Sequence, residues 1–357
     1  MSSGWDVVVL GGGIIGSASA LALARRGARV LVVDKGTPGA EASSAAAGIL
    51  GAQVEAHEDG ELARLLVKSR AMYAAWARGL EEASGVDVGY RACGALRLFA
   101  TEDERVAGVA ASSWQRAAGL ALEALSETQL AALEPAIAPT FVAAERYPDD
   151  AQVEPRALVR ALLVTGERAG VVFRGDTAVR AIARKGDRAL GVELEDGARI
   201  EADHVVLAAG SWSSLVEGTP LGATEVVPMR GQLVELTLDA PILDHAIFGP
   251  GAYLVPRNDG RVVVGSTMEL VGHRRAVTAK GARDLLSAAI AIAPALADAT
   301  LTATWSGFRP FARGGAPLVG PSSLRGLVLA TGHHRNGVLL APLTGELVAD
   351  AIASVSR

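Results

Sequence analysis

Four polar residues stand in a row near the C-terminal end of the chain, in the segment GHHRNGVLLAP of residues 332–342. An apolar, strand-like run precedes them and an apolar, helix-like run follows. Because charged and imidazole groups are costly to bury without partners, these side chains either cap the helix or face a ligand. A helix that starts here would offer free N–H groups and its positive dipole end to a negative charge. The four residues are His333, His334, Arg335 and Asn336.

Arg309, in the motif WSGFRP, is the second side chain on which chemistry could depend. The proline that follows favours an extended backbone at Arg309, so its side chain can project from a rigid junction. A guanidinium group binds a carboxylate through two parallel, charge-assisted hydrogen bonds. From the residues alone, a surface salt bridge is the simpler explanation of Arg309, and core packing is that of Met268 and Trp305.

The N-terminal run DVVVLGGGIIGSASALALARRGARVLVVDK has the pattern of a dinucleotide-binding unit. Its glycines permit a tight turn and close approach of a pyrophosphate, and the helix N-terminus binds the phosphates. The acid after the second strand lies close to the roughly 20 residues from the last glycine that suit a ribose hydroxyl. The motif alone does not separate NAD from FAD. The unit predicts a strand over 7–10, the motif glycines Gly11, Gly13 and Gly16, a helix over 17–26, a strand over 29–33 and the acid Asp34.

Residues 38–60, PGAEASSAAAGILGAQVEAHEDG, are rich in small side chains. Small side chains let a chain lie against a flat ligand, where a compact NAD domain would continue directly into its next helix. A flexible loop in an alanine-rich protein explains the same composition equally well.

Apolar spacing and turn residues divide the rest of the chain into elements. The apolar strand over 204–212 breaks at glycine as the first strand does, which suggests a return to the nucleotide-binding domain. Strands over 226–236, 252–256 and 261–267 predict an antiparallel sheet in a second domain. Helices are expected from Asp59 or Gly60, after the capping boxes at 101–104 and 126–129, and over 155–169 and 278–293; strands over 171–173, 178–183 and 190–194; and a last strand and helix within 326–354.

Composition limits the class of protein. The 357 residues are 50% apolar, enough for about two domains with large cores. A net charge of -5 without runs of like charge argues against a nucleic-acid partner. Asp6 precedes the N-terminal apolar run, no basic region opens it and glycines interrupt it, so we expect a soluble, cytoplasmic protein and no membrane contact. Cys93 is the one cysteine, which fits a reducing compartment, and the six histidines (57, 204, 245, 273, 333 and 334) show no metal-ligand spacing.

A series of later motifs identifies a family. The chain resembles the D-amino acid oxidase family, in its glycine oxidase branch, over nearly its whole length. The later motifs are more specific than the glycine turn. In chain order, the motifs that carry the resemblance are GGGIIG with VVDK, ASSAAAGILGAQVEAHEDG, VEPRALVRAL, AAGSW, PMRGQ, YLVPRNDGRVVVGSTME, WSGFRP and GHHRNGVLLAPLTGELVADAI.

The resemblance implies an α/β fold with two domains. One is an FAD-binding Rossmann-like domain and the other a substrate domain built on a mixed, largely antiparallel sheet. We expect residues 1–84, 146–220 and 301–357 to form the FAD-binding domain, and 85–145 and 221–300 to form the substrate-binding domain.

The resemblance also implies an activity. FAD would be bound without a covalent link, since Cys93, expected on a strand of the substrate domain, does not match known attachment positions. Glycine, or another small amino acid such as sarcosine, D-alanine or D-proline, would be oxidised with O2 reduced to hydrogen peroxide, and the imine would supply thiazole synthesis for thiamine. A homo-oligomer is expected. A dehydrogenase that passes electrons to a quinone or carrier, and a non-catalytic FAD-binding assembly protein, are the alternatives.

The site residues follow from the same resemblance. Arg309 would clamp the substrate carboxylate, Tyr253 would donate a further hydrogen bond, Met268 would line the pocket and Arg335 would lie near the substrate. His334 stands where the family has an aromatic residue. The residues expected to bind the cofactor are Gly11, Gly13, Ile14, Ile15, Gly16, Asp34, Lys35, Ser43, Ser44, Ala46, Ala47, Gly48, Ala209, Gly210, Trp212, Gly307, Arg335, Asn336, Gly337, Val338 and Leu339.

Overall fold

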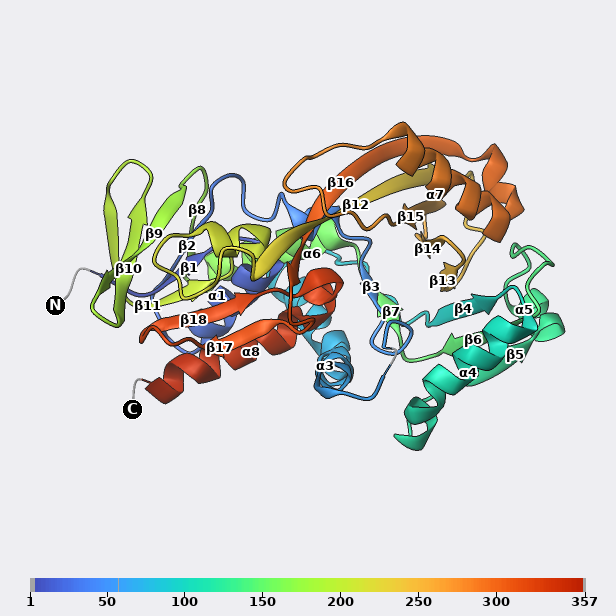
Figure 1. Cartoon of the computed structure of the whole chain (residues 1–357), viewed down its shortest axis with the longest axis horizontal. Coiled ribbons are helices and arrows are strands. Elements are labelled where there is room, and N and C mark those ends of the chain that lie inside the picture. Colours follow the sequence, from blue (N-terminus) through green and yellow to red (C-terminus); the bar gives the residue numbers. More distant parts are fainter. Residues whose placement is uncertain (1–3, 57, 356–357) are drawn as a thin grey trace.

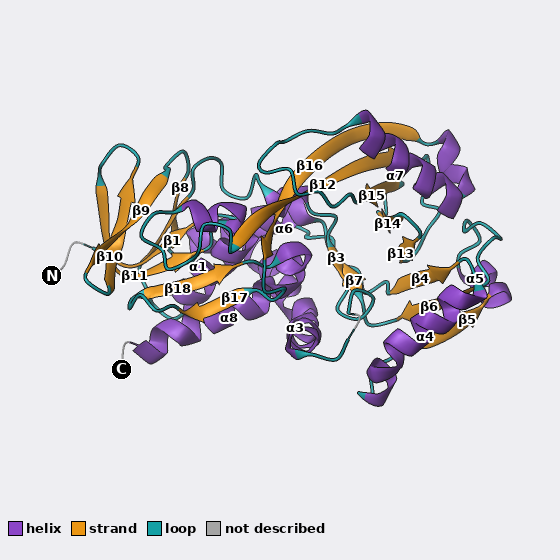
Figure 2. Ribbon diagram, in the orientation of Figure 1, coloured by secondary structure: helices purple, strands orange, loops and turns teal. Residues whose placement is uncertain are grey.

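The computed structural model describes residues 4–56 and 58–355, in two halves that each contain an eight-stranded sheet (Figure 1). His57, one of the six histidines, lies outside the described residues. A short third sheet pairs β3 (Ile49–Leu50) with β7 (Ala151–Gln152). The α/β class and the two-sheet organisation predicted from the sequence are confirmed, as Figure 2 shows.

The first sheet has the order β17-β18-β11-β1-β2-β8, and β10 and β9 extend it from β11. Pairs β18–β11, β11–β1, β1–β2 and β2–β8 are parallel. Strands buried on both faces carry continuous apolar runs, as in VVVL and VLVV. The strands are β1 Trp5–Leu10, β2 Val30–Val33, β8 Val172–Arg174, β9 Val179–Lys185, β10 Arg188–Leu194, β11 Arg199–Leu207, β17 Leu318–Pro321 and β18 Leu327–Thr331.

Four helices pack beside this sheet: α1 (Ile14–Arg25), α3 (Glu61–Ser84), α6 (Pro155–Arg168) and α8 (Gly337–Val355). Helix α8 lies closely against α1, since a β-carbon on Gly345 would approach the carbonyl oxygen of Ala18 to 2.8 Å. By length and composition the segment His334–Ser354 would pass for a membrane span. Most of that segment is buried inside the protein, as in the core helix of a folded domain.

The second sheet has the order β16-β12-β15-β14-β13-β4-β6-β5. Every neighbouring pair is antiparallel except β13–β4, which agrees with a mixed, largely antiparallel sheet. The strands are β4 Ala95–Phe99, β5 Glu123–Ser126, β6 Ala143–Tyr147, β12 Val226–Thr237, β13 Ala246–Gly249, β14 Ala252–Pro256, β15 Arg261–Gly265 and β16 Thr300–Ala312; the helices beside them are α4 Glu102–Ala117, α5 Glu127–Leu133 and α7 Ala279–Ile292.

The predicted domain boundaries need two corrections. Residues 301–312 were placed in the FAD-binding domain, but they form most of β16, which pairs with β12 over its length in the second sheet. The boundary at 145 also divides β6, which belongs entirely to that sheet. Strands β12 and β16 are long and run from the second sheet back to the first half (Figure 1). The boundary between the domains therefore does not fall at the end of a strand.

Local sequence signals account for several helix ends. Ser126 and Gln129 form the predicted reciprocal capping box. Thr101 accepts a hydrogen bond from the backbone N–H of Glu104, but the Glu104 carboxylate accepts from the N–H of Ala100, one residue before the box would require. Pro155 begins α6, a position at which a backbone N–H would have no acceptor within the helix, so its absence costs no hydrogen bond.

Candidate cofactor and substrate site

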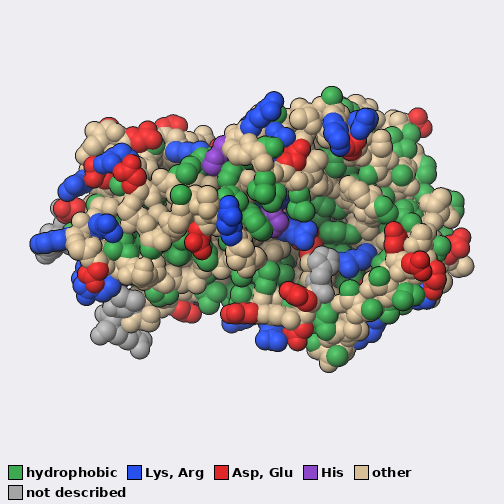
Figure 3. All heavy atoms as spheres, viewed as in Figure 1, with side chains coloured by type: hydrophobic (Ala, Val, Ile, Leu, Met, Phe, Trp, Pro, Cys, Tyr) green, Lys and Arg blue, Asp and Glu red, His purple; other side chains and the backbone are tan. Residues whose placement is uncertain are grey.

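A cavity of ≈ 680 Å³ is lined by both halves of the molecule. Figure 3 shows the face that is hollowed between the halves, with a histidine and basic side chains beside the hollow. Most of the residues predicted for the site lie in its wall. They are Gly11, Gly13, Ile14, Ile15, Asp34, Lys35, Ser43, Ala46, Gly48, Ala209, Gly210, Trp212, Tyr253, Met268, Gly307, Arg309, Arg335, Gly337 and Val338.

Five predicted residues do not line this cavity: Gly16, Ser44, Ala47, Asn336 and Leu339. A β-carbon on Gly16 would lie 1.9 Å from a backbone carbonyl oxygen of the glycine turn, so Gly16 serves the packing of α1. Ser44 donates its hydroxyl to a backbone carbonyl at 2.7 Å. Ala47 and Leu339 are buried, and each accepts a hydrogen bond at its carbonyl oxygen. The N–H of Asn336 closes the turn before α8.

The glycine turn between β1 and α1 is shaped by close backbone approaches. Gly11 has φ +100°, and a β-carbon there would lie 2.4 Å from the carbonyl oxygen of Ala208. A β-carbon on Gly13 would meet only the Ser43 hydroxyl, at 3.1 Å. Gly11 is therefore required by the fold, whereas Gly13 leaves room at the cavity wall.

Asp34 ends β2 and ties the glycine turn to the strand. Its carboxylate accepts hydrogen bonds from the N–H groups of Gly12 (2.8 Å) and Gly36 (3.0 Å). Burial raises the pKa of Asp34, although these two bonds act in the opposite direction. The carboxylate lines the cavity beside the turn, as the spacing of the motif predicts.

The small-residue segment forms part of the cavity wall. Its short helix α2 (Ala42–Ala45) packs against β16 and α6. The Ser43 hydroxyl accepts a hydrogen bond from the N–H of Ile14 at 2.8 Å, and the Trp305 indole N–H donates to the carbonyl oxygen of Ala45 at 3.0 Å. These contacts favour the interpretation as a ligand-facing wall over a flexible loop.

An aromatic cluster closes the end of the cavity near Asp34. The Nζ of Lys35 lies 3.3 Å from the ring centroid of Trp212, which stacks on His273 at 4.5 Å. His273 comes from the loop after β15, and it also approaches the Ser211 hydroxyl at 3.2 Å. Arg275 of the same loop pairs with Glu41. The loop after β15, which belongs to the second half of the molecule, therefore packs against the part of the cavity wall that the first half provides.

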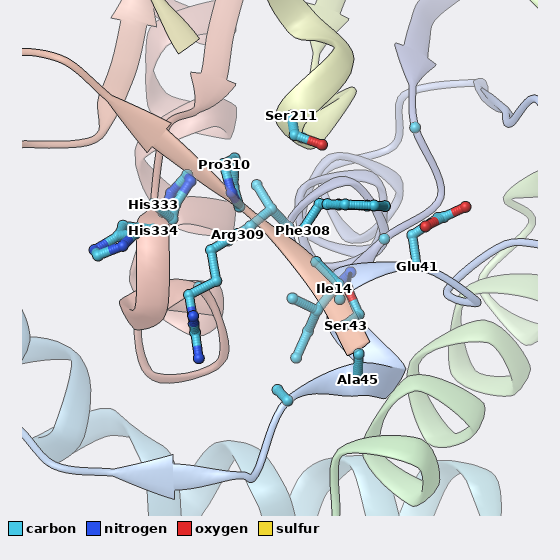
Figure 4. Close-up of a pocket in the computed structure, with 18 of the residues that line it drawn as sticks. Ile14, Glu41, Ser43, Ala45, Ser211, Phe308, Arg309, Pro310, His333 and His334 are labelled. Carbon is cyan, nitrogen blue, oxygen red and sulfur yellow. Dashed lines mark hydrogen bonds between the residues drawn. The ribbon is translucent and has the colours of Figure 1, made fainter. Parts of the chain in front are cut away.

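Arg309 lies at the opposite side of β16 from Phe308, because successive side chains of a strand alternate (Figure 4). Its side chain extends from the strand into the space beside the turn of His333 and His334. The guanidinium donates to the carbonyl oxygen of Thr267 at 3.1 Å and to the Ser266 hydroxyl at 2.5 Å. Among the ion pairs of the described residues, none includes Arg309, which contradicts its explanation as a surface salt bridge.

Tyr253 and Met268 also line the cavity, on β14 and after β15. The Tyr253 hydroxyl lies over Gly265, where a β-carbon would approach it to 2.4 Å. Met268 is 61% exposed, so it is a residue of the cavity rim and has no place in the core.

Glu55 is the main cavity residue that the sequence analysis missed. Its Oε2 lies 3.3 Å from Nε of Arg335, with the Glu55 side chain 13% exposed and that of Arg335 40% exposed. The available signal was an acid inside the small-residue segment, which was interpreted only as a surface for a flat ligand or as a flexible loop. Other wall residues that the sequence analysis did not propose are Glu41, Thr177, Ala178, Val179, Arg180, Glu195, Ser211, Gly231, Phe248, Gly251, Ser266, Phe308 and Pro310.

The start of α8 is fixed by α3. Pro342 lies inside α8 and has no N–H to give to the carbonyl oxygen of Val338, one turn earlier. The hydroxyl of the fully buried Tyr73 donates to that oxygen instead, at 3.0 Å, and the Ser69 hydroxyl donates to the carbonyl of Leu339 at 2.6 Å. These bonds hold the N-terminal end of α8 at the cavity wall, which Gly337 and Val338 line.

Replacing Tyr73 with phenylalanine should lower the free energy of unfolding by about 1–3 kcal/mol, because a buried carbonyl loses its partner. Urea unfolding measures this difference. Tyr90→Phe is the matched control, since its ring stacks on Tyr73, and it should change the free energy by less than about 0.5 kcal/mol. Equal stabilities of Tyr73→Phe and wild type would contradict the role of this bond.

His333 belongs to the cavity wall but is only 3% exposed, and its Nε2 lies 3.0 Å from the Thr344 hydroxyl. Burial lowers the pKa of His333 to about 3. The imidazole is therefore neutral in the folded protein, whereas the unfolded chain takes up a proton near the ordinary histidine pKa of about 6.5. The His333 side chain makes no capping hydrogen bond at this junction, and its neutral ring pairs with Thr344 of α8.

This pKa difference predicts a loss of stability in acid. As the pH falls from about 6.5 towards 3, the unfolded state binds a proton that the folded state excludes, so the free energy of unfolding declines by up to ~1.4 kcal/mol per pH unit. His333→Gln should remove this contribution. Urea unfolding at pH 7, 6 and 5 should give a shallower decline for the variant, by about 2 kcal/mol between pH 6.5 and 5. Parallel declines in the two proteins would show that His333 is not the group concerned.

His334 is the second histidine of the junction and lines the cavity. Its backbone is left-handed, with φ 50°, and its ring meets Phe311 edge-on at 5.1 Å. Burial lowers the pKa of His334 to about 4, helped by the charges of Arg309 and Arg335. An uncharged imidazole therefore stands beside the two arginines.

No group of three or more His, Cys, Asp or Glu side chains suited to a metal occurs within residues 4–56 and 58–355. Cys93 lies two residues before β4, so the prediction that it is on a strand is wrong by that margin. Burial raises the pKa of its thiol, and Cys93 does not line the cavity.

The cavity wall fits a dinucleotide. The glycine turn leads into α1, whose first-turn N–H groups have no acceptor within the helix, and Gly13 leaves space beside them. Asp34 at the end of β2 suits a ribose hydroxyl. The start of α8 and Arg309 lie in the same wall, so a ligand could extend from the turn to the arginines.

Comparisons with known proteins agree with this geometry. A family model described as FAD dependent oxidoreductase matches residues 6–351. Glycine oxidase of Geobacillus kaustophilus (strain HTA426) is 36% identical over 356 residues, which cover 99% of this chain and 94% of that protein. The crystal structure of glycine oxidase from Geobacillus kaustophilus superimposes with a TM-score of 0.93 at 35% identity, over 99% of this chain and 95% of that one.

A longer relative shows the same match over part of its length. The bifunctional protein ThiO/ThiG of Nostoc sp. (strain PCC 7120 / SAG 25.82 / UTEX 2576) is 35% identical over 352 residues. The match covers 97% of this chain but 52% of that protein, so the chain spans about half the length of this relative.

Proposed function

Because the chain belongs to the FAD dependent oxidoreductase family, we propose that it oxidises the amine of glycine and of other small amino acids, with O2 as electron acceptor. Sarcosine, D-alanine and D-proline are the further substrates. The carbon–nitrogen bond loses a hydride and a proton to become an imine, and O2 is reduced to hydrogen peroxide. Water converts the imine to an oxo acid and ammonia or, where the nitrogen carries a second carbon as in sarcosine and D-proline, to an oxo acid and an amine. The observation that carries the proposal is Arg309, whose guanidinium lacks a carboxylate partner among the described residues, in the cavity that contains the glycine turn.

FAD, when bound, supplies the acceptor for the hydride and passes the electrons to O2. Gly11, Gly13 and Asp34 would hold it. Arg309 would fix the substrate carboxylate by two parallel hydrogen bonds, with the Tyr253 hydroxyl as a further donor. The first turn of α8 would stabilise negative charge that develops in the cavity, through its free N–H groups and dipole. The protein needs no side chain as general base if the substrate binds as the neutral amine.

The experiment is a substrate panel scored by peroxide release, with the purified protein saturated with FAD. Peroxide from glycine, sarcosine, D-alanine or D-proline is the expected result. Acid precipitation should release intact FAD, and colour that stays with the precipitate would contradict non-covalent binding. Turnover with a dye but almost none with O2 would favour a dehydrogenase. Absence of reaction with every amine would favour a non-catalytic assembly role.

The wider setting of the activity is also a proposal. We infer that the imine supplies thiazole synthesis for thiamine, because the relative ThiO/ThiG joins a matching half to a second half in one chain. The net charge of -5 argues against a nucleic-acid partner, and the single cysteine agrees with a cytoplasmic setting. We expect a homo-oligomer without a membrane partner. Light scattering of the purified protein tests the oligomeric state.

A further inference from the structure

Glu55 is an acid in the cavity wall that faces two arginines. Within the described residues it forms one ion pair, with Arg335 at 3.3 Å, and its side chain is largely buried. Burial raises the pKa of Glu55, while the charges of Arg335 and Arg309 act in the opposite direction. Because a buried carboxylate is costly without a partner, the contact with Arg335 stabilises it in this position.

The backbone before Glu55 is held rigidly. The N–H groups of Gln53 and Val54 donate to the buried carboxylate of Asp150, at 3.2 Å and 2.9 Å. Arg70 pairs with the same carboxylate at 2.7 Å, and Arg97 donates to the carbonyl oxygen of Val54. The backbone that leads into Glu55 is therefore fixed in the cavity wall, and the side chain of Glu55 reaches Arg335 from this fixed position.

The two arginines of the cavity differ in their partners. Arg335 is paired with Glu55, whereas Arg309 donates only to neutral oxygens in the hydrogen bonds of the described residues. His334, whose pKa is lowered by burial and by both arginines, is uncharged at neutral pH. When Glu55 is ionised, its charge offsets that of its partner Arg335, and the charge of Arg309 remains for one carboxylate.

We propose that Glu55 sets the number of carboxylates that the cavity accepts: by occupying Arg335 it leaves Arg309 for a single carboxylate, and so selects amines with one carboxylate over those with two. This inference rests on the proposed function for its substrate class. Neutralising Glu55 without changing its shape frees Arg335 to bind a second carboxylate.

The test compares the FAD-saturated wild type with Glu55→Gln at pH 8.5, since alkaline pH favours the ionised form of the acid. Binding of glycolate, with one carboxylate, and of oxydiacetate, with two, is measured by calorimetry. The ratio of their dissociation constants should shift towards oxydiacetate by at least ~10-fold in Glu55→Gln, since one charge-assisted hydrogen bond is of that order. The ratio of kcat/KM for D-aspartate over its amide D-asparagine should rise by a similar factor.

Glu346→Gln is the matched control, because Glu346 also pairs with an arginine, Arg26, but on the exposed face of α8. It should leave both ratios as in wild type. The double variant Glu55→Gln/Arg335→Met should return to the wild-type ratios, and it tests the inference even if Glu55→Gln does not fold. Unchanged ratios in Glu55→Gln, or a gain that persists in the double variant, would overturn the proposal.

The binding measurement separates this inference from the proposed function. If the wild type binds glycolate but releases no peroxide from any amine, the proposed function fails, while the shift towards oxydiacetate still decides the role of Glu55. If the wild type binds neither ligand, the account of charge in the cavity is wrong.

Discussion

Arg309→Ala is expected to weaken substrate binding by at least ~10², because two hydrogen bonds to a charged group, each worth about 1.5–3 kcal/mol, are lost. The structure strengthens this expectation, since the guanidinium has only the neutral oxygens of Ser266 and Thr267 as partners. Replacing Arg309 therefore breaks no ion pair among the described residues, and the loss should affect the binding of the substrate carboxylate. The measurement is anaerobic bleaching of the oxidised flavin against glycine concentration.

Two further variants grade the effect. Arg309→Lys should recover only part of the affinity, because a point charge does not reproduce the guanidinium fork. Tyr253→Phe removes one neutral hydrogen bond and should weaken binding by roughly tenfold. All three variants should retain FAD, since the residues are assigned to the substrate. If Arg309→Ala keeps the wild-type concentration dependence, the clamp lies elsewhere and Arg335 becomes the better candidate.

Gly13→Val is expected to yield a folded protein that contains little FAD. A β-carbon at Gly13 meets only the hydroxyl of Ser43, at 3.1 Å, so the fold can accept it, but the side chain would occupy the cavity beside the first turn of α1. FAD content should fall by about tenfold or more, equivalent to ~1.4 kcal/mol or more of lost binding. Absorbance of the purified protein gives the FAD content, and far-ultraviolet circular dichroism gives the folding.

Gly16→Val is the informative comparison. A β-carbon at Gly16 would lie 1.9 Å from the carbonyl oxygen of Gly11, inside the packing of α1 on β1. This variant should fail to fold. The comparison would show that Gly13 contacts the ligand, whereas Gly16 is needed for packing. Full FAD occupancy in Gly13→Val would show that the cofactor does not approach this turn.

Local features of the structure were predictable because short stretches of sequence encode them. The glycine turn, the capping box at Ser126 and the start of α6 at Pro155 each depend on backbone conformations and hydrogen bonds within a few residues. The parallel strands of the first sheet were predictable from continuous apolar runs. Most of the proposed cavity residues were also predictable from motifs, since each motif specifies a local backbone conformation.

Within one motif, the residues that pack in the core were harder to distinguish from the residues that line the cavity. Gly16, Ala47 and Leu339 belong to motifs that line the cavity, but they face the core or pack backbone against backbone. A motif gives the position of a residue along the chain. Which face of the element meets the ligand depends on the neighbouring elements.

The sequence by itself determined the dinucleotide-binding unit, the α/β class with two sheets, and the arginines available to an anion, because these are properties of residue type and local spacing. Only the tertiary structure decided that β16 completes the second sheet, that Tyr73 holds the start of α8, and that Glu55 pairs with Arg335. The physical reason is that each of these contacts joins segments far apart in the chain. Packing of whole elements brings such segments together, and a local sequence pattern does not predict which of them will be in contact.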